Sequence, residues 1–438
     1  MVNKRTHEIR DPIHVFIRLD SDERKVLDSP PFQRLRHIHQ LALTYLVYPG
    51  ATHKRFEHSL GVMELASRIY DVVTDPENIY QQYASVRDII PIYRQFDHLH
   101  WRRTLRLAAL CHDLGHLPFS HVSEELLPED WDHERMTMEI ILGKELADIL
   151  RQIHVQPEDV AKLVIGPKKS KAYLKVELNE WENILSEIIT GDVFGADRMD
   201  YLLRDSYHAG VAYGKFDHYR LIDTMRVLPK QEAGGSQEPV LGVEEGGLES
   251  AEALLLARYF MFSQIYFHPV RLIYDEHLLD FLKSWLDKGL FPTDWKEHLK
   301  YTDNEVISAM LSIAQNKSHP AHIHADRIVN RRHFRSIYRS TAEDRKLLEP
   351  GKKIYEAASE KFGEENVKHV EKTQTRSVSD FPVLVQGTRI AQAASEKETF
   401  EDVTSVYEHV FVSAEMKNEA NTWLLNNREG ILSSAGGG

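Results

Sequence analysis

The sequence predicts a mainly α-helical protein that carries a short β-hairpin and a small mixed C-terminal lobe. Apolar residues recur at helical spacing over most of the first 315 residues, which is the pattern of amphipathic helices. Glycine and proline interrupt this pattern between Pro229 and Leu248, and two runs typical of strands follow later, Phe381–Val385 and Tyr407–Val412. Because 42 % of the 438 residues are hydrophobic, the chain has ample material for a core, and wholesale disorder is excluded.

Four stretches of the N-terminal half have the clearest helical pattern. Pro30–Leu43 opens with two prolines, which favour the first turn of a helix, and Arg55–Val73 is an amphipathic run. Arg103–Cys111 is apolar on nearly every side, as expected of a central helix. A long helix is expected over about 183–207, with a bend near its two glycines.

The glycine-rich interruption and the late strands suggest how the chain is divided. We expect a hairpin near residues 225–245, followed by further helices. Residues 1–325 are therefore predicted to form one core with a helical extension. Residues 326–438 are predicted to form a small α+β lobe, which includes a helix over 414–425 and ends in a disordered tail from 433.

Charge and cysteine content exclude several classes of protein. With 67 acidic and 54 basic residues, the net charge of −13 disfavours general nucleic-acid binding, which needs a positive surface. The single cysteine excludes an intramolecular disulfide framework and a cysteine-rich zinc module, so a metal site must use His, Asp and Glu. No run of 18 apolar residues and no apolar leader is found, so we expect a cytoplasmic protein without a membrane span.

The histidines are unevenly spread, since ten of the 24 lie between His37 and His133. His112 and Asp113 follow the apolar helix directly, and a polar pair in that position needs a charge, a hydrogen bond or a metal as partner. Three further histidines follow within 21 residues: His116, His121 and His133.

Other residues complete a set of metal-ligating type. Asp197, Tyr201 and Asp205 are spaced i, i+4 and i+8, so one helix face presents all three. Two imidazoles and two carboxylates would come together from His58, His112, Asp113 and Asp197. This mixture suits manganese, iron, zinc or nickel better than calcium, and it leaves positions open for water and phosphate. The alternative is ordinary core or surface histidines, which explains a lone histidine better than this ordered set.

Three stretches together resemble the HD-domain metal-dependent phosphohydrolases. They are FQRLRHIHQL with YPGATHKRFEHSLGV (Phe32–Val62), LCHDLGHLPFSH with WDHE (Leu110–Glu134), and ADRMDYLLRDSYHAG (Ala196–Gly210). Within that family, the chain is most similar to deoxynucleoside triphosphate (dNTP) triphosphohydrolases of the sterile-alpha-motif/HD and bacterial dGTPase type. Arg10–Leu19 and Ala257–Pro269 fit the same pattern. The resemblance covers about the first 280 residues and implies an HD-domain helical core, without a sterile-alpha-motif domain.

The resemblance implies roles for the clustered residues. His58, His112, Asp113 and Asp197 would hold a divalent metal ion (Mn, Fe, Mg, Zn, Ni or Co), which would polarise an α-phosphate oxygen and activate water. A general acid is needed because the leaving group is the 5′-oxygen of the nucleoside. The candidates for acid–base catalysis are His116, His121, Glu124 and His133, and the acid and the base among the histidines stay unassigned. Glu124 stands where the family has aspartate.

The resemblance also implies a set of substrate contacts: Gln40, Leu41, Arg55, Arg198, Tyr201, Asp205, Arg258 and Tyr266. The three arginines would bind the phosphates, although each alone is also compatible with a surface salt bridge. Asp205 would accept from the sugar 3′-hydroxyl beside Gln40. Leu41 and Tyr266 would crowd the 2′ position and so favour deoxyribose, with simple core packing as the alternative for Tyr266. Ala42 departs from the glycine usual in the family.

A second nucleotide site is a further expectation from the resemblance. Asp28, Gln33 and Arg36 match an allosteric pocket of regulated members, but His7 stands where a lysine is expected. The basic run 331–335, which includes Arg332, would add cations, unless it is a solvated charged face. An activator nucleotide and a homo-oligomer, with a tetramer favoured, are the partners that this implies.

The expected activity is hydrolysis of a dNTP to deoxynucleoside and inorganic triphosphate. One alternative is another HD phosphohydrolase, a nuclease or a nucleotide phosphodiesterase, in which His116, His121 and His133 complete a two-metal site. A second alternative is a nucleotide-binding regulator with little turnover. The complete ligand set argues against the regulator, because a protein that only binds nucleotides has no need of His112 and Asp113.

Overall fold

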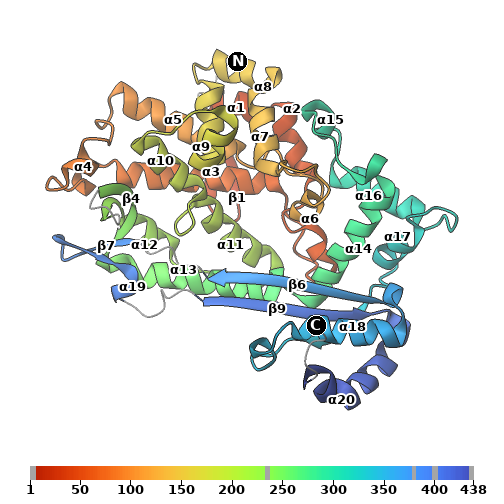
Figure 1. The fold of residues 1–438 in the computed structure, drawn as a ribbon. Coiled ribbons are helices and arrows are strands. Elements are labelled where there is room, and N and C mark those ends of the chain that lie inside the picture. The colour runs from red at the N-terminus through yellow and green to blue at the C-terminus, as the bar shows by residue number, and fades with distance from the viewer. Residues whose placement is uncertain (1–5, 232–236, 377–380, 397–402, 434–438) are drawn as a thin grey trace. The chain divides into compact units, whose positions relative to one another are not determined.

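The computed structural model describes residues 6–231, 237–376, 381–396 and 403–433, and it is mainly α-helical, as expected (Figure 1). Ser433, the first residue of the disordered tail that we expected, is instead the last residue of a helix, and the rest of that tail, 434–438, lies outside the described residues. Within the described part of the chain, no helix is long and apolar enough to cross a membrane.

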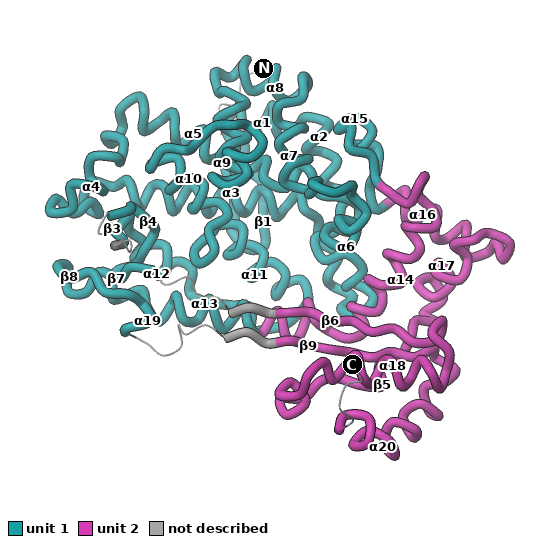
Figure 2. Tube along the Cα trace, viewed as in Figure 1, with its two compact units in different colours: residues 1–259, 291–303, 378–401 teal, residues 260–290, 304–377, 402–438 magenta. Residues whose placement is uncertain are grey.

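The chain forms two compact units, each built from non-contiguous segments (Figure 2). Unit 1 comprises Met1–Tyr259, Phe291–Asp303 and Val378–Glu401. Unit 2 comprises Phe260–Leu290, Asn304–Ser377 and Asp402–Gly438. The sequence suggested a single boundary near residue 325 instead. Because the chain passes between the units several times, no change in composition marks where one ends.

Most helices belong to unit 1. They are α1 (Ser21–Leu27), α2 (Pro30–Gln33), α3 (Arg55–Val73), α4 (Ala84–Arg87), α5 (Phe96–Cys111), α6 (His121–Glu124), α7 (His133–Leu142), α8 (Lys144–Gln152), α9 (Pro157–Lys169), α10 (Glu180–Thr190), α11 (Ala196–Ala209), α12 (His218–Asp223), most of α13 (Leu248–Met261), α15 (Trp295–His298) and α19 (Ala393–Glu396). Helix α3 has the bounds expected from its apolar pattern.

Helix α3 lies at the centre of unit 1, where α5, α10 and α11 pack against it. Its apolar residues recur three or four positions apart and are buried, as an internal helix requires. Gly61 permits the close approach of α11, because a Cβ at that position would lie 1.9 Å from Asp200 Oδ1. This packing brings the histidine of α3 to the aspartates of α11.

Two sheets complete unit 1. Strands β1 (Thr6–Asp11) and β2 (Val15–Asp20) form an antiparallel hairpin. A second sheet has the order β3-β4-β7-β8, with strands β3 (Met225–Gln231), β4 (Gln237–Glu244), β7 (Pro382–Val385) and β8 (Arg389–Gln392). The antiparallel β3–β4 pair includes Met225 opposite Val243, so the hairpin expected there is confirmed over its described residues.

Unit 2 combines helices with one sheet. Its helices are α14 (Pro269–Trp285), α16 (from Asp303, the last residue of unit 1, to Ile313), α17 (His322–Val329), α18 (Pro350–Phe362) and α20 (Lys417–Ser433). Its antiparallel sheet has the order β5-β9-β6, formed by β5 (Arg335–Arg339), β9 (Val403–Val412) and β6 (Val367–Arg376). Helices α18 and α20 pack on this sheet through buried apolar residues that include Ile354, Ala358 and Leu424.

Two helical expectations need correction. The stretch 30–43 is not one helix: α2 ends at Gln33, a 3-10 turn covers Arg34–His37, and an isolated bridge pairs His39 with Lys54. The helix expected over 183–207 is two helices, because extended backbone at Gly191 and Gly195 separates α10 from α11. The local apolar spacing is helical in both places, but backbone pairing and glycine override it.

Candidate active site

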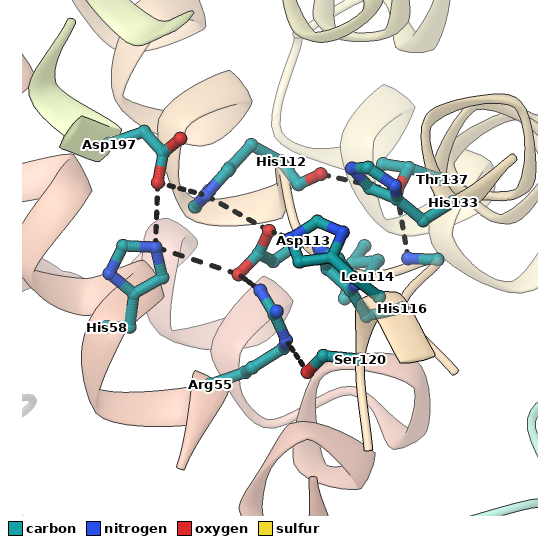
Figure 3. Close-up of polar contacts among 12 residues, drawn as sticks. Arg55, His58, His112, Asp113, Leu114, His116, Ser120, His133, Thr137 and Asp197 are labelled. Atoms are coloured by element: carbon teal, nitrogen blue, oxygen red, sulfur yellow. Dashed lines mark hydrogen bonds and ion pairs between the residues drawn. The ribbon is translucent and has the colours of Figure 1, made fainter. Parts of the chain in front are cut away.

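Four predicted ligands converge at the point where α3, α5 and α11 meet (Figure 3). His58 lies one turn into α3, His112 and Asp113 follow the last residue of α5, and Asp197 lies in the first turn of α11. His58 Nε2 lies 3.0 Å from Asp197 Oδ1 and 3.7 Å from Asp113 Oδ2. His112 Nε2 lies 3.2 Å from Asp113 Oδ1 and 3.6 Å from Asp197 Oδ1.

This arrangement fits a divalent metal ion. Ligand atoms of His58, His112 and Asp197 all lie within 4.8 Å of one another. His112 Nε2 is buried and makes no hydrogen bond, which is costly unless a metal or a substrate group completes it. The Asp197 side chain is 33 % exposed, so the cluster is open on one side. Three or four nitrogen and oxygen ligands with an open position are typical of a catalytic site.

Charge pairing in the cluster opposes the effect of burial. Burial alone would lower the pKa of His58, but hydrogen bonds with Asp197 and Asp200 raise it to about 10. Burial likewise would raise the pKa of Asp197, yet His112 and His58 hold it below its usual range. Burial would also raise the pKa of Asp113, but the nearby Arg55 and His112 hold it well below its usual range. The cluster therefore presents ionised carboxylates to a cation.

A buried carboxylate orients His58 from the side opposite Asp197. Asp200 Oδ2 lies 2.8 Å from His58 Nδ1, so this ring nitrogen donates and Nε2 faces the cluster. Asp200 also accepts from His14 Nε2 at 2.7 Å and from the guanidinium of Arg204 at 2.8 and 2.9 Å. Arg204 is fully buried and also donates to Asp11, at 2.8 Å. These bonds connect the turn of the β1–β2 hairpin to a predicted metal ligand.

A second cluster joins the four predicted acid–base residues. Glu124 Oε1 accepts from His121 Nδ1 at 2.7 Å, and Oε2 accepts from His133 Nδ1 at 3.0 Å. The rings of His116 and His133 stack at 4.0 Å, and His116 Nε2 lies 3.2 Å from Asp113 Oδ1. Glu124 therefore binds two histidines at once. Despite its burial, these histidines lower its pKa. The four residues also have the spacing of a possible metal site.

Arg55 connects the metal cluster to the loop that precedes α6. Its Nη1 donates to Asp113 Oδ2 at 2.5 Å, and its Nε donates to Ser120 Oγ at 2.8 Å. The side chain is only 4 % exposed, so the surface salt bridge that we considered does not apply to it. Arg55 is therefore a buried cation next to a predicted metal ligand.

Asp205 and Gln40 are linked through a residue to which we had assigned no role. His53 Nε2 lies 2.7 Å from Asp205 Oδ1, and the His53 carbonyl accepts from the Gln40 N–H at 3.0 Å. His208 stacks on the His53 ring at 4.4 Å. Gln40 Oε1 is buried without a hydrogen bond, and the neighbouring Leu41 is buried. The two residues predicted to contact the sugar thus belong to one group.

Two arginines and a tyrosine form a further group. Tyr201 interacts with Arg198 and Arg258, and burial together with Arg198 lowers the pKa of Arg258. Two cations held this close to each other suit a polyanionic ligand. Tyr266 lies in unit 2, in a single π-helical turn, Phe262–Tyr266, where it packs edge-on against Phe262.

The residues expected at an allosteric site make contacts within the chain. Arg36 donates to Gln33 Oε1 at 2.8 Å and lies 3.5 Å from the centroid of the Phe56 ring. Asp28 pairs with Arg24, whose guanidinium also contacts the imidazole of His7. In unit 2, Arg332 lies 3.2 Å from Asp326. The second nucleotide site remains a prediction.

Four buried residues next to the site carried no predicted role: His39, His53, Asp200 and Asp303. Helical spacing could have identified Asp200, because it lies one turn after Asp197 and one turn before Arg204. No local pattern identifies Asp303, whose partners at residues 39 and 119 are far away in the sequence.

Two segments of the chain match known protein-family models. Residues 55–172 match the model of the HD domain, and residues 216–398 match the HD-associated region. A crystal structure of a hypothetical protein from Aquifex aeolicus is 33 % identical, with a TM-score of 0.75, and the alignment covers 96 % of this chain and all of that one. The chain belongs to the HD-domain phosphohydrolase family. The predicted metal ligands His58, His112 and Asp113 lie inside the matched HD domain.

The curated relatives extend over longer chains. A protein of Methanocaldococcus jannaschii is 37 % identical over 309 residues, which are 70 % of this chain and 55 % of that protein. The human deoxynucleoside triphosphate triphosphohydrolase is 34 % identical over 243 residues, which are 50 % of this chain and 36 % of the enzyme. The chain thus spans about half the length of the curated relatives that it matches first. A phosphohydrolase from Bacteroides thetaiotaomicron, 21 % identical, has the same fold with a TM-score of 0.70.

Proposed function

We propose that this HD-family protein hydrolyses dNTPs to deoxynucleoside and inorganic triphosphate with the help of a divalent metal ion. The observation that carries the proposal is the convergence of His58, His112, Asp113 and Asp197 next to the histidine–glutamate cluster around Glu124. The human relative named for this activity supports the choice of substrate.

The site residues have different roles in the proposed reaction. A metal ion held by the four ligands would supply Lewis acidity toward the α-phosphate. Glu124 holds the Nδ1–H of His121, whose side chain is 69 % exposed and free to reach a substrate. His121 Nε2 is therefore our choice as the proton donor to the departing 5′-oxygen. His116 and His133 stack on each other, and the hydrogen bonds from His121 and His133 keep Glu124 ionised.

Two groups would select the substrate. Arg55, Arg198 and Arg258 offer cations for the phosphates. Asp205, held by His53, would accept a hydrogen bond from the 3′-hydroxyl, with Gln40 close by. Leu41 and Tyr266 would exclude a 2′-hydroxyl. We further propose that the metal ion is Mn, Fe, Mg, Zn, Ni or Co, and that the protein is a cytoplasmic tetramer. An activator nucleotide would bind at Asp28, Gln33, Arg36 and Arg332.

The decisive experiment incubates the purified protein with each of four dNTPs and four NTPs, singly and mixed, in Mn²⁺ or Mg²⁺. We expect chromatography to detect deoxynucleoside and triphosphate from at least one dNTP and little product from NTPs. The double variant His112→Ala, Asp113→Ala should bind no metal and release no product, because it lacks two of the four ligands.

Other outcomes would favour a different function or a second metal ion. Tight dNTP binding without triphosphate under any metal would favour a nucleotide-binding regulator. Release of pyrophosphate or cleavage of oligonucleotides would favour another HD phosphohydrolase. Two metal ions per chain would assign a metal to the Glu124 cluster as well.

A further inference from the structure

Asp303, the first residue of α16, binds two loops of unit 1 that lie far from it in the sequence. It is fully buried. Its Oδ2 accepts from the His39 backbone N–H at 2.7 Å and from His39 Nδ1 at 2.6 Å. Its Oδ1 accepts from the backbone N–H of Phe119 at 2.8 Å. One carboxylate therefore fixes the loop before Gln40 and the loop before His121.

The second of these loops has a conformation that needs such an anchor. Phe119 has φ 58° and Ser120 has φ 60°, so two successive residues other than glycine lie in the left-handed region. The hydrogen bond to Asp303 holds the Phe119 peptide in this orientation. Ser120 Oγ donates to the His39 carbonyl at 3.1 Å and accepts from Arg55 Nε at 2.8 Å. The turn immediately precedes His121, the first residue of α6.

A continuous path of contacts leads from Asp303 to the metal cluster. It runs through His39 to Ser120, from Ser120 to Arg55, and from Arg55 Nη1 to Asp113 Oδ2. The second ring nitrogen of His39 also makes a hydrogen bond. His39 Nε2 lies 2.6 Å from Lys54 Nζ, so this nitrogen accepts and Nδ1 carries the proton given to Asp303.

We propose that Asp303 is a positioning residue that holds Gln40, Arg55 and His121 in their working geometry. The assignment rests on the proposed function, because those three residues are its substrate contacts and proton donor. Both oxygens of the carboxylate are needed, since N–H groups approach from two sides. An amide has one accepting oxygen and would turn an NH₂ group toward one of these donors.

Asp303→Asn tests the proposal with two independent readouts. We expect kcat/KM for the preferred dNTP to fall about 10- to 100-fold, as is typical when a residue that orients a site is replaced. Part of this loss should appear as a higher KM, through Arg55 and Gln40. The affinity for Mn²⁺ alone, by calorimetry, should stay within about twofold because Asp303 bonds His39 and Phe119 and none of the four ligands directly. Hydrogen exchange at the Phe119 amide should accelerate.

A matched control separates positioning from stability. Asp344 in unit 2 is also buried, at 4 % exposed, and accepts from the Thr341 N–H at 2.9 Å and from Arg428. Asp344→Asn should lower the melting temperature and leave kcat/KM and Phe119 exchange unchanged. Wild-type kcat/KM in folded Asp303→Asn, with or without faster exchange, would overturn the proposal.

A milder variant serves if Asp303→Asn does not fold. Ser120→Ala removes only the hydroxyl that connects His39 to Arg55, and it should raise KM in the same direction. An unchanged KM there would overturn the proposal. If the wild-type protein hydrolyses no dNTP, the proposed function fails by itself, whereas exchange at Phe119 still reports whether Asp303 holds the turn.

Discussion

At the scale of single residues, the orientation of His58 depends on a carboxylate that lies behind it. Asp200 receives the Nδ1 proton of His58, and Nε2 on the other side of the ring faces Asp197 Oδ1 at 3.0 Å. In the absence of a cation, His58 holds an extra proton, since its pKa is raised to about 10. Binding of a metal must displace that proton, so we expect metal affinity to increase with pH.

Asp200→Asn should weaken Mn²⁺ binding about 10- to 100-fold. The amide can present NH₂ to His58 Nδ1, which favours the tautomer with its proton on Nε2 and blocks the ligand atom. The control is His14→Gln, whose amide can still donate to Asp200 Oδ1 without touching His58. Calorimetric titration of both folded variants measures the effect. Equal Mn²⁺ affinities in the wild type and Asp200→Asn would contradict the orienting role of Asp200.

The predicted ligands and their supporting residues differ in how visible they are in the sequence. His58, His112, Asp113 and Asp197 fall in short motifs, so their convergence could be predicted. Asp303 could not be, because its hydrogen bonds join residues 39, 119 and 303 through the tertiary fold alone. For the same reason His53 was assigned no role, although it pairs with the predicted sugar contact Asp205. The supporting residues become identifiable only when the loops are placed in space.

At the scale of elements, α10 carries a carboxyl group that burial perturbs. Glu187 packs toward β4, where its Oε2 accepts from the Leu241 N–H at 3.0 Å. Burial raises the pKa of Glu187 to about 7, although the Leu241 hydrogen bond opposes this shift. The folded protein therefore binds the Glu187 proton more tightly than the unfolded chain does, for which the usual pKa is about 4.5.

Glu187→Gln should stabilise the protein at high pH and leave it unchanged at low pH. The tighter binding of this proton stabilises the wild-type fold fully below about pH 4.5. This contribution is lost as the pH rises to about 7, and it is absent at higher pH. At pH 9 we expect the variant to gain about 1–3 kcal/mol, because a glutamine needs no ionisation and can still accept from Leu241. Urea titrations followed by tryptophan fluorescence, to which Trp181 on the same helix contributes, measure this. The exposed Glu180→Gln is the control, and a gain of equal size at pH 5 would refute the assignment.

The elements themselves could be predicted where local pattern and fold agree. Helix α3 and the β3–β4 hairpin matched because an apolar face and a glycine-rich stretch of sequence each indicate them locally. Residues 34–43 did not match, since His39 and Lys54 form a bridge that no local spacing reveals. The β1–β2 hairpin was not anticipated, because its turn is held by Asp11 bonding to His14 and Arg204 rather than by glycine.

At the scale of the whole molecule, one unit contains every predicted metal ligand. Unit 1 supplies α3, α5 and α11, whereas unit 2 holds the β5-β9-β6 sheet with its own apolar core. A boundary near residue 325 was expected because runs typical of strands follow it in the sequence. Each unit instead consists of three separate segments, so the two colours alternate along the chain in Figure 2. Sequence composition does not reveal which segments belong to the same unit.

This division predicts that a metal ion stabilises the two units unequally. Mn²⁺ bound by His58, His112, Asp113 and Asp197 connects three helices of unit 1, and at 100 times its dissociation constant it should stabilise them by about 2.7 kcal/mol. Hydrogen exchange in α3, α5 and α11 should therefore slow on adding Mn²⁺ and recover with a chelator. Exchange in β6 and β9 should hardly change, because stability is local to each cooperative unit. In the His112→Ala, Asp113→Ala variant Mn²⁺ should protect neither unit. Equal protection of both units by Mn²⁺ would instead mean that they unfold as one.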